Sequence, residues 1–248
     1  MNNRTKFGLV GKNIEYSFSK KYFTNKFNEL GLIKYSYTNF DLPEIFEFPF
    51  ILYQKEDEFK GFNVTIPYKQ EIIKYLNELD ETSISVGAVN TIKVSEDNKL
   101  IGFNTDVYGF QKSLQPILKK HHTKALILGT GGASKAIAFA LKKLAIEFKI
   151  VSRYKAENVI TYSELTKEIM DDYKLIINCT PLGTSPNTEQ YPDLPYEYLG
   201  DKHLLYDLVY NPEMTKFLVK GKKRGAIIKN GYEMLELQAE KSWEIWNS

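Results

Sequence analysis

The stretch GFNVTIPYK, residues 61 to 69, carries three polar side chains that together could bind a ligand and transfer a proton. Asn63 and Thr65 are two apart in an extended run, so their side chains point to the same face of the strand. Pro67 ends the run, and Lys69 follows closely enough to share the space above the two polar groups. An ammonium there could donate a proton to a carbonyl that is being reduced. The alternative is a lysine that points into water, as most lysines do.

A glycine-rich turn lies further along, in KALILGTGGASKAIAFALKKLAIEFKIVSR, residues 124 to 153. A buried strand precedes the glycines, and an alanine-rich helix and a second strand follow them. In this setting Gly129 permits a tight turn, Gly131 lets the backbone approach a pyrophosphate, and the helix start offers free N–H groups. Ser134 stands where the pattern has its third glycine. The stretch predicts a dinucleotide site rather than a glycine turn without a ligand.

The end of the second strand indicates which dinucleotide is bound. An NAD enzyme usually offers Asp or Glu there to the ribose, whereas Arg accommodates the 2′-phosphate of NADP. This chain has Ser152, Arg153 and Lys155, and reaches no carboxylate before Glu157. Arg153 can hold a phosphate through two hydrogen bonds or stack on adenine. NADP is favoured, the alternative being that both cations are solvated surface residues.

The composition limits the possible partners. The chain has 248 residues, with 33 Lys plus Arg and 31 Asp plus Glu, and its net charge of +2 gives no long-range field for nucleic acid or an anionic membrane. No stretch approaches the roughly 18 apolar residues that span a bilayer. The single Cys179 allows no internal disulfide, and three histidines leave no zinc-like cluster. We expect a soluble, unprocessed cytoplasmic protein that has no metal and binds a small molecule.

Strands and helices alternate along the chain, which is typical of an α/β protein with mainly parallel sheets. The pattern predicts strands at 6–11, 35–42 and 59–67, helices at 19–32 and 69–80, and a hairpin over 85–106 that turns at Asp97-Asn98. A helix from Val107 to about Lys120 then leads into the glycine-rich unit.

The chain resembles the shikimate dehydrogenase family in six motifs that occur in order over nearly its whole length. They are GFNVTIPYK (61–69), GAVNT (87–91), GFNTD (102–106), GTGGAS (129–134), YDLVYNP (206–212) and GYEMLELQA (231–239). The family reduces 3-dehydroshikimate to shikimate with NADPH, in the chorismate pathway to aromatic amino acids. The resemblance implies two domains with an active-site cleft between them. One is an N-terminal α/β substrate domain, residues 1–105 completed by a C-terminal helix at 232–248, and the other is a Rossmann-type NADP-binding domain at 106–231.

The resemblance also implies roles for individual residues. Lys69 and Asp106 match the catalytic pair, with Lys69 as general acid/base and Asp106 orienting it and a neighbouring hydroxyl. The residues that match substrate ligands are Ser17, Ser19, Asn63, Thr65, Asn90, Tyr210 and Gln238. The residues that match cofactor positions are Gly129, Gly131, Gly132, Ala133, Ser152, Arg153, Lys155, Leu208 and Gly231. Taken alone, Asn90 and Asn104 are equally well explained as turn residues, and Gln238 as an exposed helical residue.

This sequence departs from the family pattern at two places, and other functions stay open. Tyr16 and Lys20 replace a His before the serine pair and a Pro after it, and Tyr154 and Lys155 replace a Thr and an Arg beside Arg153. A quinate/shikimate dehydrogenase that uses NAD is the nearest alternative. An NADP-binding redox sensor would not need Lys69 and Asp106. An interaction surface at the basic stretch 220–224 is a third reading, and the expected assembly is a monomer or a homodimer.

Overall fold

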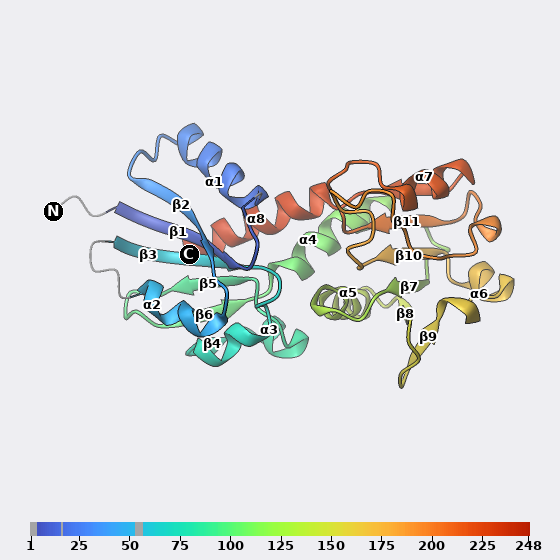
Figure 1. Cartoon of the computed structure of the whole chain (residues 1–248), viewed down its shortest axis with the longest axis horizontal. Helices are drawn as coiled ribbons and strands as arrows, with labels where there is room; N and C mark the ends of the chain where they lie inside the picture. The colour runs from blue at the N-terminus through green and yellow to red at the C-terminus, as the bar shows by residue number, and fades with distance from the viewer. Residues whose placement is uncertain (1–3, 16, 53–56) are drawn as a thin grey trace. The chain divides into compact units, whose positions relative to one another are not determined.

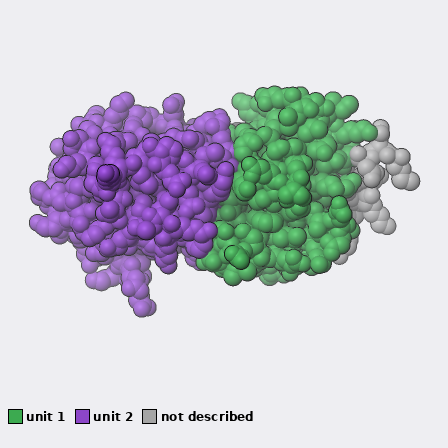
Figure 2. Space-filling view, turned by 180° about the vertical axis from the view of Figure 1, so that it is seen from behind, with its two compact units in different colours: residues 1–105, 239–248 green, residues 106–238 purple. Residues whose placement is uncertain are grey.

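The computed structural model describes residues 4–15, 17–52 and 57–248, and the chain divides into two compact units. The first unit comprises Met1–Thr105 and Ala239–Ser248, and the second comprises Asp106–Gln238 (Figure 2). Tyr16, one of the departures from the family pattern, lies outside the described residues.

The first unit is built on a mixed six-stranded sheet of order β2-β1-β3-β5-β6-β4 (Figure 1). Its strands are β1 (Arg4–Gly11), β2 (Tyr35–Asp41), β3 (Asp57–Val64), β4 (Glu78–Leu79), β5 (Thr91–Val94) and β6 (Leu100–Phe103). β1 runs parallel to β2 and β3, while β5 is antiparallel to β3 and β6. The strands predicted near 6–11 and 35–42 and the hairpin are confirmed. Asn98 in the hairpin turn has a φ of 60°, a left-handed conformation that asparagine adopts more readily than most residues.

Short helices connect these strands: α1 (Phe18–Glu29), η1 (Ile45–Glu47), α2 (Phe48–Leu52), η2 (Glu71–Tyr75) and α3 (Glu81–Val86). The prediction of a helix over 69–80 is wrong, because only η2 is helical there and β4 follows it. Neighbouring backbone groups explain the difference. The N–H groups of Asn77 and Asp80 donate to the carbonyls of Leu100 and Gly102, so this segment joins the hairpin as an edge strand.

The last helix, α8 (Tyr232–Trp246), completes the first unit with its final residues. Trp246 packs directly on β3, since a Cβ built on Gly61 would lie 2.1 Å from the indole nitrogen. That nitrogen donates to the carbonyl of Ile92 over 2.9 Å. Phe7 and Phe23 pack around the same indole, with ring centroids 4.7 and 5.1 Å away. Glycine at position 61 is therefore a packing requirement.

The second unit contains a parallel six-stranded sheet of order β12-β11-β10-β7-β8-β9 (Figure 1). Its strands are β7 (Lys124–Leu128), β8 (Glu147–Ser152), β9 (Val159–Thr161), β10 (Leu175–Asn178), β11 (Leu204–Asp207) and β12 (Ile227–Lys229). Counted from the first strand of this sheet, the order is 3-2-1-4-5-6, which is the Rossmann arrangement. The strand order reverses between β7 and β10, where such folds bind their ligands.

The helices of the second unit are α4 (Thr105–Leu114), α5 (Gly132–Lys143), α6 (Lys167–Asp172) and α7 (Lys216–Lys223), with 3-10 turns η3 (Gln115–Ile117), η4 (Tyr162–Glu164) and η5 (Tyr196–Tyr198). The helix predicted from Val107 to about Lys120 is present but ends at Leu114. Pro116 explains the early end, because its ring has no N–H for an α-helical hydrogen bond.

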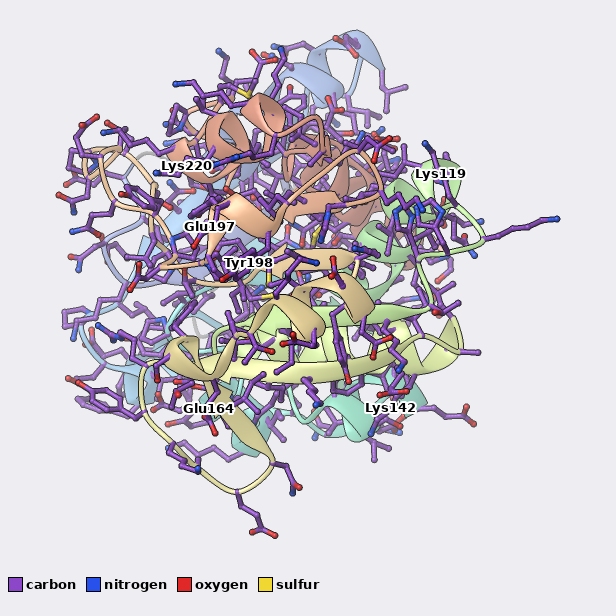
Figure 3. All side chains as sticks on the ribbon, turned by 90° about the vertical axis from the view of Figure 1, so that its right-hand side faces the viewer. Lys119, Lys142, Glu164, Glu197, Tyr198 and Lys220 are labelled. Atoms are coloured by element: carbon purple, nitrogen blue, oxygen red, sulfur yellow. The ribbon has the colours of Figure 1, made fainter. Side chains whose placement is uncertain are left out.

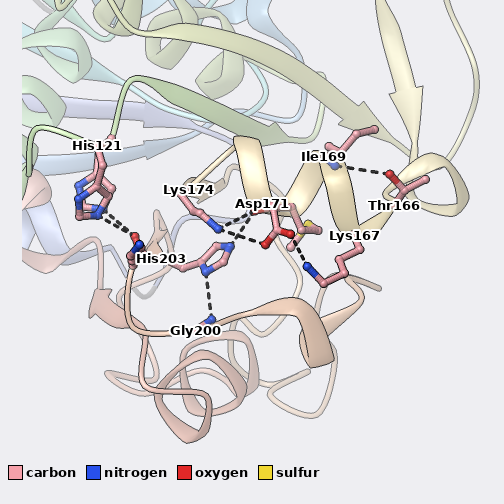
Figure 4. Close-up of polar contacts among 11 residues, drawn as sticks. His121, Thr166, Lys167, Ile169, Asp171, Lys174, Gly200 and His203 are labelled. Carbon is pink, nitrogen blue, oxygen red and sulfur yellow. Dashed lines mark hydrogen bonds and ion pairs between the residues drawn. The ribbon is translucent and has the colours of Figure 1, made fainter.

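Two histidines of this unit stabilise loops through hydrogen bonds between their rings and backbone groups. The Nδ1 atom of buried His203 accepts a hydrogen bond from the Gly200 N–H, and its Nε2 atom lies 2.9 Å from the carbonyl oxygen of Met170 (Figure 4). His122 likewise accepts from the Lys119 N–H. Within the described ranges no group of three or more His, Cys, Asp or Glu could hold a metal ion, and no helix is long and apolar enough to cross a membrane.

The basic stretch 220–224 lies at the end of α7, and its first lysine packs on aromatic rings. The Lys220 ammonium lies 4.4 Å from the ring centroid of Tyr191 and 5.0 Å from that of Tyr196, near the turn that carries Glu197 and Tyr198 (Figure 3). Cation–π contacts of this kind stabilise the fold by about 0.5–1 kcal/mol each at exposed sites.

Candidate active site

The proposed substrate residues of the first unit begin where its parallel strands end. The segments after β1 and β3 leave the sheet at the same edge, because these strands are parallel neighbours. The Thr65 N–H donates to the carbonyl of Val10 over 2.9 Å. A Cβ built on Gly11 would lie 2.5 Å from the Thr65 methyl group, so the two segments touch. The serine pair follows Gly11, and Ser17 caps α1 by accepting a hydrogen bond from the Ser19 N–H over 3.2 Å.

Lys69 lies in a turn that several hydrogen bonds anchor. The Tyr68 N–H donates to the carbonyl of Thr65, and the buried Tyr68 hydroxyl donates to the carbonyl of Leu42 over 2.6 Å. The carbonyl of Lys69 itself accepts from the Val89 N–H over 2.7 Å. Lys69 is half-buried, in contrast to a lysine that extends freely into water. These three hydrogen bonds therefore hold the backbone of the turn that carries Lys69.

The expected alternation along GFNVTIPYK holds only as far as Val64, where β3 ends. Val64 is buried as expected, but Ile66 lies in the following turn and is 73% exposed. The strand predicted to run to Pro67 is therefore shorter than expected, although the Thr65 N–H still donates to the carbonyl of Val10 in β1.

Asn63 is held by a polar network inside the first unit. Its Oδ1 atom accepts from the Tyr37 hydroxyl over 2.8 Å, and its Nδ2 atom donates to the Ser242 hydroxyl over 3.0 Å. Ser242 also lies 2.8 Å from the hydroxyl oxygen of Thr91. These bonds join β2, β3 and β5 to α8, which explains why a strand carries polar groups toward the interior.

Asn90 bonds to the first residue of α4, and Asp106 belongs to the first turn of that helix. The Oδ1 atom of Asn90 accepts from the Thr105 N–H over 2.7 Å, and Asn90 is only 3% exposed. Asn104 donates to the carbonyl of Ala88 over 2.9 Å, as a residue that stabilises a turn does. Asp106 is buried in the first turn of α4, where a carboxylate interacts favourably with the helix dipole. Gln238 is half-buried on α8, so it is not an exposed helical residue.

The glycine turn of the second unit has the geometry that a dinucleotide requires. Gly129 has a φ of +107°, and a Cβ built on it would lie 3.1 Å from the Thr180 methyl group just after β10. A Cβ built on Gly131 meets nothing within 4 Å, so this residue borders open space. Gly132 and Ala133 open α5, whose first N–H groups have no partner within the helix. The turn fits a pyrophosphate at the point where the sheet order reverses.

The two cations after β8 differ in their contacts with other side chains. Arg153 is exposed, and its guanidinium carbon lies 5.7 Å from the ring centroid of Tyr154. Lys155 pairs with Glu164 over 3.3 Å. Hydrogen bonds from the Thr161 backbone and hydroxyl, followed by Lys155, hold the pKa of the Glu164 carboxyl below its usual value. Lys155 therefore has a carboxylate neighbour that the sequence spacing did not suggest.

The segment after β11 contacts the segment before α8. The carbonyl oxygen of Leu208 would lie 2.2 Å from a Cβ built on Gly231, and the Gly231 N–H donates to the carbonyl of Val209 over 3.2 Å. Glycine is required at position 231 by this approach. Tyr210 is half-buried nearby in the chain, and burial raises the pKa of its hydroxyl.

Sequence reasoning missed Asp207, which is fully buried at the end of β11. Burial raises the pKa of this carboxyl to about 6, although hydrogen bonds from Thr215, Val209 and Asn178 counteract the shift. The sequence could have indicated Asp207, because it directly precedes the proposed cofactor residue Leu208 within the motif YDLVYNP.

The sheet order, the glycine turn and the cation after the second strand define a dinucleotide-binding α/β protein of the Rossmann type. Comparisons with known proteins are more specific. Residues 9–92 match the family model described as "Shikimate dehydrogenase substrate binding domain". A shikimate dehydrogenase (NADP(+)) of Clostridium botulinum is 40% identical, and the match covers 96% of this chain and 95% of that protein. The chain belongs to the shikimate dehydrogenase family, as the six motifs indicated.

Two solved structures agree with this assignment. A shikimate dehydrogenase in complex with NADP+ is 34% identical, with a TM-score of 0.86, and the match covers 98% of this chain and 90% of that one. The enzyme of Thermus thermophilus, solved with NADP(H) and shikimate, is 29% identical with a TM-score of 0.85, and the match covers 98% and 93% of the two chains. The predicted α/β fold with a Rossmann-type part is confirmed.

Proposed function

We propose that this protein is an NADP-dependent shikimate dehydrogenase, which reversibly reduces 3-dehydroshikimate to shikimate on the route to chorismate and the aromatic amino acids. The observation that carries the proposal is the match over 96% of the chain to an NADP-dependent relative, with the GFNVTIPYK and GFNTD motifs present. The same chain has a Rossmann sheet with an open glycine turn, which suits a dinucleotide that carries a hydride.

Lys69 and Asp106 are the proposed catalytic residues. Bound NADPH would supply the hydride for the ketone carbon, and negative charge then develops on the ketone oxygen. The Lys69 ammonium donates a proton to that oxygen, which gives the alcohol, and the neutral amine takes the proton back in the reverse direction. Asp106 is the second member of the pair and orients the reacting groups through hydrogen bonds.

Neutral hydrogen-bonding groups suit a hydroxylated ring with one carboxylate. Ser17 and Ser19 are proposed to bind the carboxylate, and the ligands proposed for the rest of the substrate are Asn63, Thr65, Asn90, Tyr210 and Gln238. A site of this kind discriminates strongly, because the wrong substrate leaves buried polar groups without partners. The internal bonds of Asn63 favour a role in which it holds neighbouring ligands in place.

The cofactor is proposed to bind the glycine turn, the residues after β8 and the Leu208–Gly231 contact. The full proposed set is Gly129, Gly131, Gly132, Ala133, Ser152, Arg153, Lys155, Leu208 and Gly231. Arg153 is the residue expected to select the 2′-phosphate of NADP. The pairing of Lys155 with Glu164 supports a smaller contribution from Lys155.

We also propose that residues 1–105 with 232–248 form the substrate domain and that residues 106–231 form the NADP domain. A cytoplasmic location and a monomeric or homodimeric assembly stay predictions from the sequence.

The test follows nicotinamide absorbance with the purified protein, in four combinations of NADP or NAD with shikimate or quinate. The proposal predicts the highest kcat/KM for NADP with shikimate. A preference for NAD with either acid would favour the quinate/shikimate dehydrogenase alternative. Tight NADPH binding without turnover of shikimate or quinate would contradict the proposed reaction and favour the redox sensor.

A further inference from the structure

The buried carboxylate of Asp207 receives hydrogen bonds from three segments of the second unit: the end of β10, the residues that follow Asp207 itself, and the start of α7. Asn178, the last residue of β10, donates from Nδ2 to Oδ1 over 2.9 Å, and the Val209 N–H donates to the same oxygen over 3.0 Å. The Thr215 hydroxyl donates to Oδ2 over 2.6 Å. Thr215 also caps α7 by accepting from the Leu218 N–H. A fully buried carboxylate is costly unless such donors satisfy it, so the three segments are tied to one point.

The hydrogen bond from Asn178 to Asp207 connects the carboxylate to the glycine turn through Thr180. Because the Asn178 NH2 group faces Asp207, its Oδ1 atom must face the other way, and there it accepts from the Thr180 N–H over 3.0 Å and from the Thr180 hydroxyl over 2.6 Å. Thr180 is thereby held with its methyl group 3.1 Å from the Cβ position of Gly129. Reversing the Asn178 amide would place its oxygen against the carboxylate, which excludes the other orientation.

The hydrogen bond from the Val209 N–H to Asp207 connects the carboxylate to the Leu208–Gly231 contact. The bond from Val209 to Asp207 fixes the backbone one residue after Leu208, and the Val209 carbonyl accepts from the Gly231 N–H. The Leu208 N–H donates to the carbonyl of Asn178 over 3.0 Å, so this segment and the end of β10 are also linked directly.

We propose that Asp207 is a positioning residue of the dinucleotide site, which holds the glycine turn and the Leu208–Gly231 contact in place relative to each other. The inference rests on the proposed assignment of these two segments to the cofactor. Removal of the carboxylate leaves the Asn178 amide, the Val209 N–H and the Thr215 hydroxyl without their acceptor. The end of β10 and the Leu208 segment then keep only their backbone link from Leu208 to Asn178, and the site is less well preorganised for the cofactor.

The experiment measures the NADPH dissociation constant by fluorescence titration, together with steady-state kinetics. Asp207→Ala should weaken NADPH binding about tenfold or more, which is the effect expected from losing acceptors for several buried donors. The KM for shikimate at saturating NADP should stay within about twofold of the wild-type value. Asp207→Asn should stay within about threefold in NADPH affinity, because its Oδ1 atom can still accept from Asn178 and Val209.

A matched control is Ser113→Ala, which removes a buried hydroxyl that lies 2.6 Å from the hydroxyl oxygen of Tyr206. It perturbs the same unit without touching the three segments, so NADPH affinity should be unchanged. If Asp207→Ala does not fold, Thr180→Val replaces it. That variant removes the hydroxyl that donates to Asn178 and accepts from the Leu182 N–H. It keeps the methyl group against Gly129 and should bind NADPH about threefold more weakly.

Wild-type NADPH affinity in Asp207→Ala, or in Thr180→Val where that variant is used, would overturn the proposal. An equal loss in Ser113→Ala would also overturn it, because a general structural effect would then explain the result. The titration contains no shikimate, so a wild-type protein that binds NADPH but does not oxidise shikimate contradicts only the proposed reaction. A wild-type protein that binds no NADPH would remove the cofactor assignment and this inference with it.

Discussion

Lys69 and Arg153 are the cations with the main proposed roles, in proton transfer and in cofactor recognition, and their surroundings differ. Lys69 is half-buried in a turn where its own carbonyl accepts from the Val89 N–H and the neighbouring Tyr68 hydroxyl donates to the carbonyl of Leu42. Arg153 is exposed beside Tyr154 at the end of β8. A fixed backbone suits a proton donor that must meet one oxygen, whereas an exposed guanidinium suits a phosphate that arrives from solvent.

Replacing Arg153 with Ala should raise the KM for NADP roughly 10- to 100-fold, since about 1.5–3 kcal/mol of charge-assisted hydrogen bonding to the 2′-phosphate is lost. The KM for NAD, which lacks this phosphate, should change less than about twofold. Initial rates with each cofactor at saturating shikimate measure both values. Equal increases for NADP and NAD would show that Arg153 does not recognise the 2′-phosphate.

The packing of α8 against β3 depends on the absence of a side chain at position 61. The Cβ position of Gly61 lies 2.1 Å from the Trp246 indole nitrogen and 2.7 Å from the carbonyl oxygen of Ile92. The same helix carries Ser242 into the Asn63 network. The end of the chain therefore stabilises the strand that leads to the Lys69 turn.

Gly61→Ala should lower the free energy of unfolding by roughly 1–3 kcal/mol, because the added methyl group overpacks this contact. Urea denaturation measures the change. Gly200→Ala is the matched control, since a Cβ at Gly200 meets nothing within 4 Å. The control should be neutral or stabilise by up to about 1 kcal/mol. An unchanged stability of Gly61→Ala would mean that α8 can shift away from β3 at little cost.

Periodicity and turn residues predicted most strands, the hairpin and the strand–turn–helix unit around Gly129, because those signals are local. They failed over 69–80, where bonds from Asn77 and Asp80 to the hairpin decide the conformation. Motifs predicted the candidate site residues as a set. They could not predict that Lys155 faces Glu164 or that Asp207 ties separate loops together, since these contacts join residues distant in sequence or depend on side-chain direction.

The buried Asp207 makes the free energy of unfolding of the protein depend on pH. Burial raises the pKa of its carboxyl to about 6 in the folded protein, compared with an ordinary value of 3.8. The folded state therefore binds more protons than the unfolded state between these values. This contribution to stability is present at low pH and is lost as pH rises through about 6.

Asp207→Asn removes this titration. The free energy of unfolding of the variant minus that of the wild type should become more positive by about 2 kcal/mol between pH 4 and pH 7.5. Urea denaturation of both proteins at the two pH values gives this difference, and the other carboxyl groups cancel in the comparison. A difference that does not change with pH would contradict the raised pKa.

Lys69 is proposed to donate the proton in an NADP-dependent reduction, and Lys69→Ala removes that proton donor. Turnover of the variant with NADP and shikimate should fall by roughly 10²- to 10⁴-fold, the usual contribution of a general acid or base. Its dissociation constant for shikimate, measured by calorimetry, should stay within about threefold of the wild-type value. Turnover near the wild-type rate together with weak shikimate binding would contradict the claim and make Lys69 a binding residue.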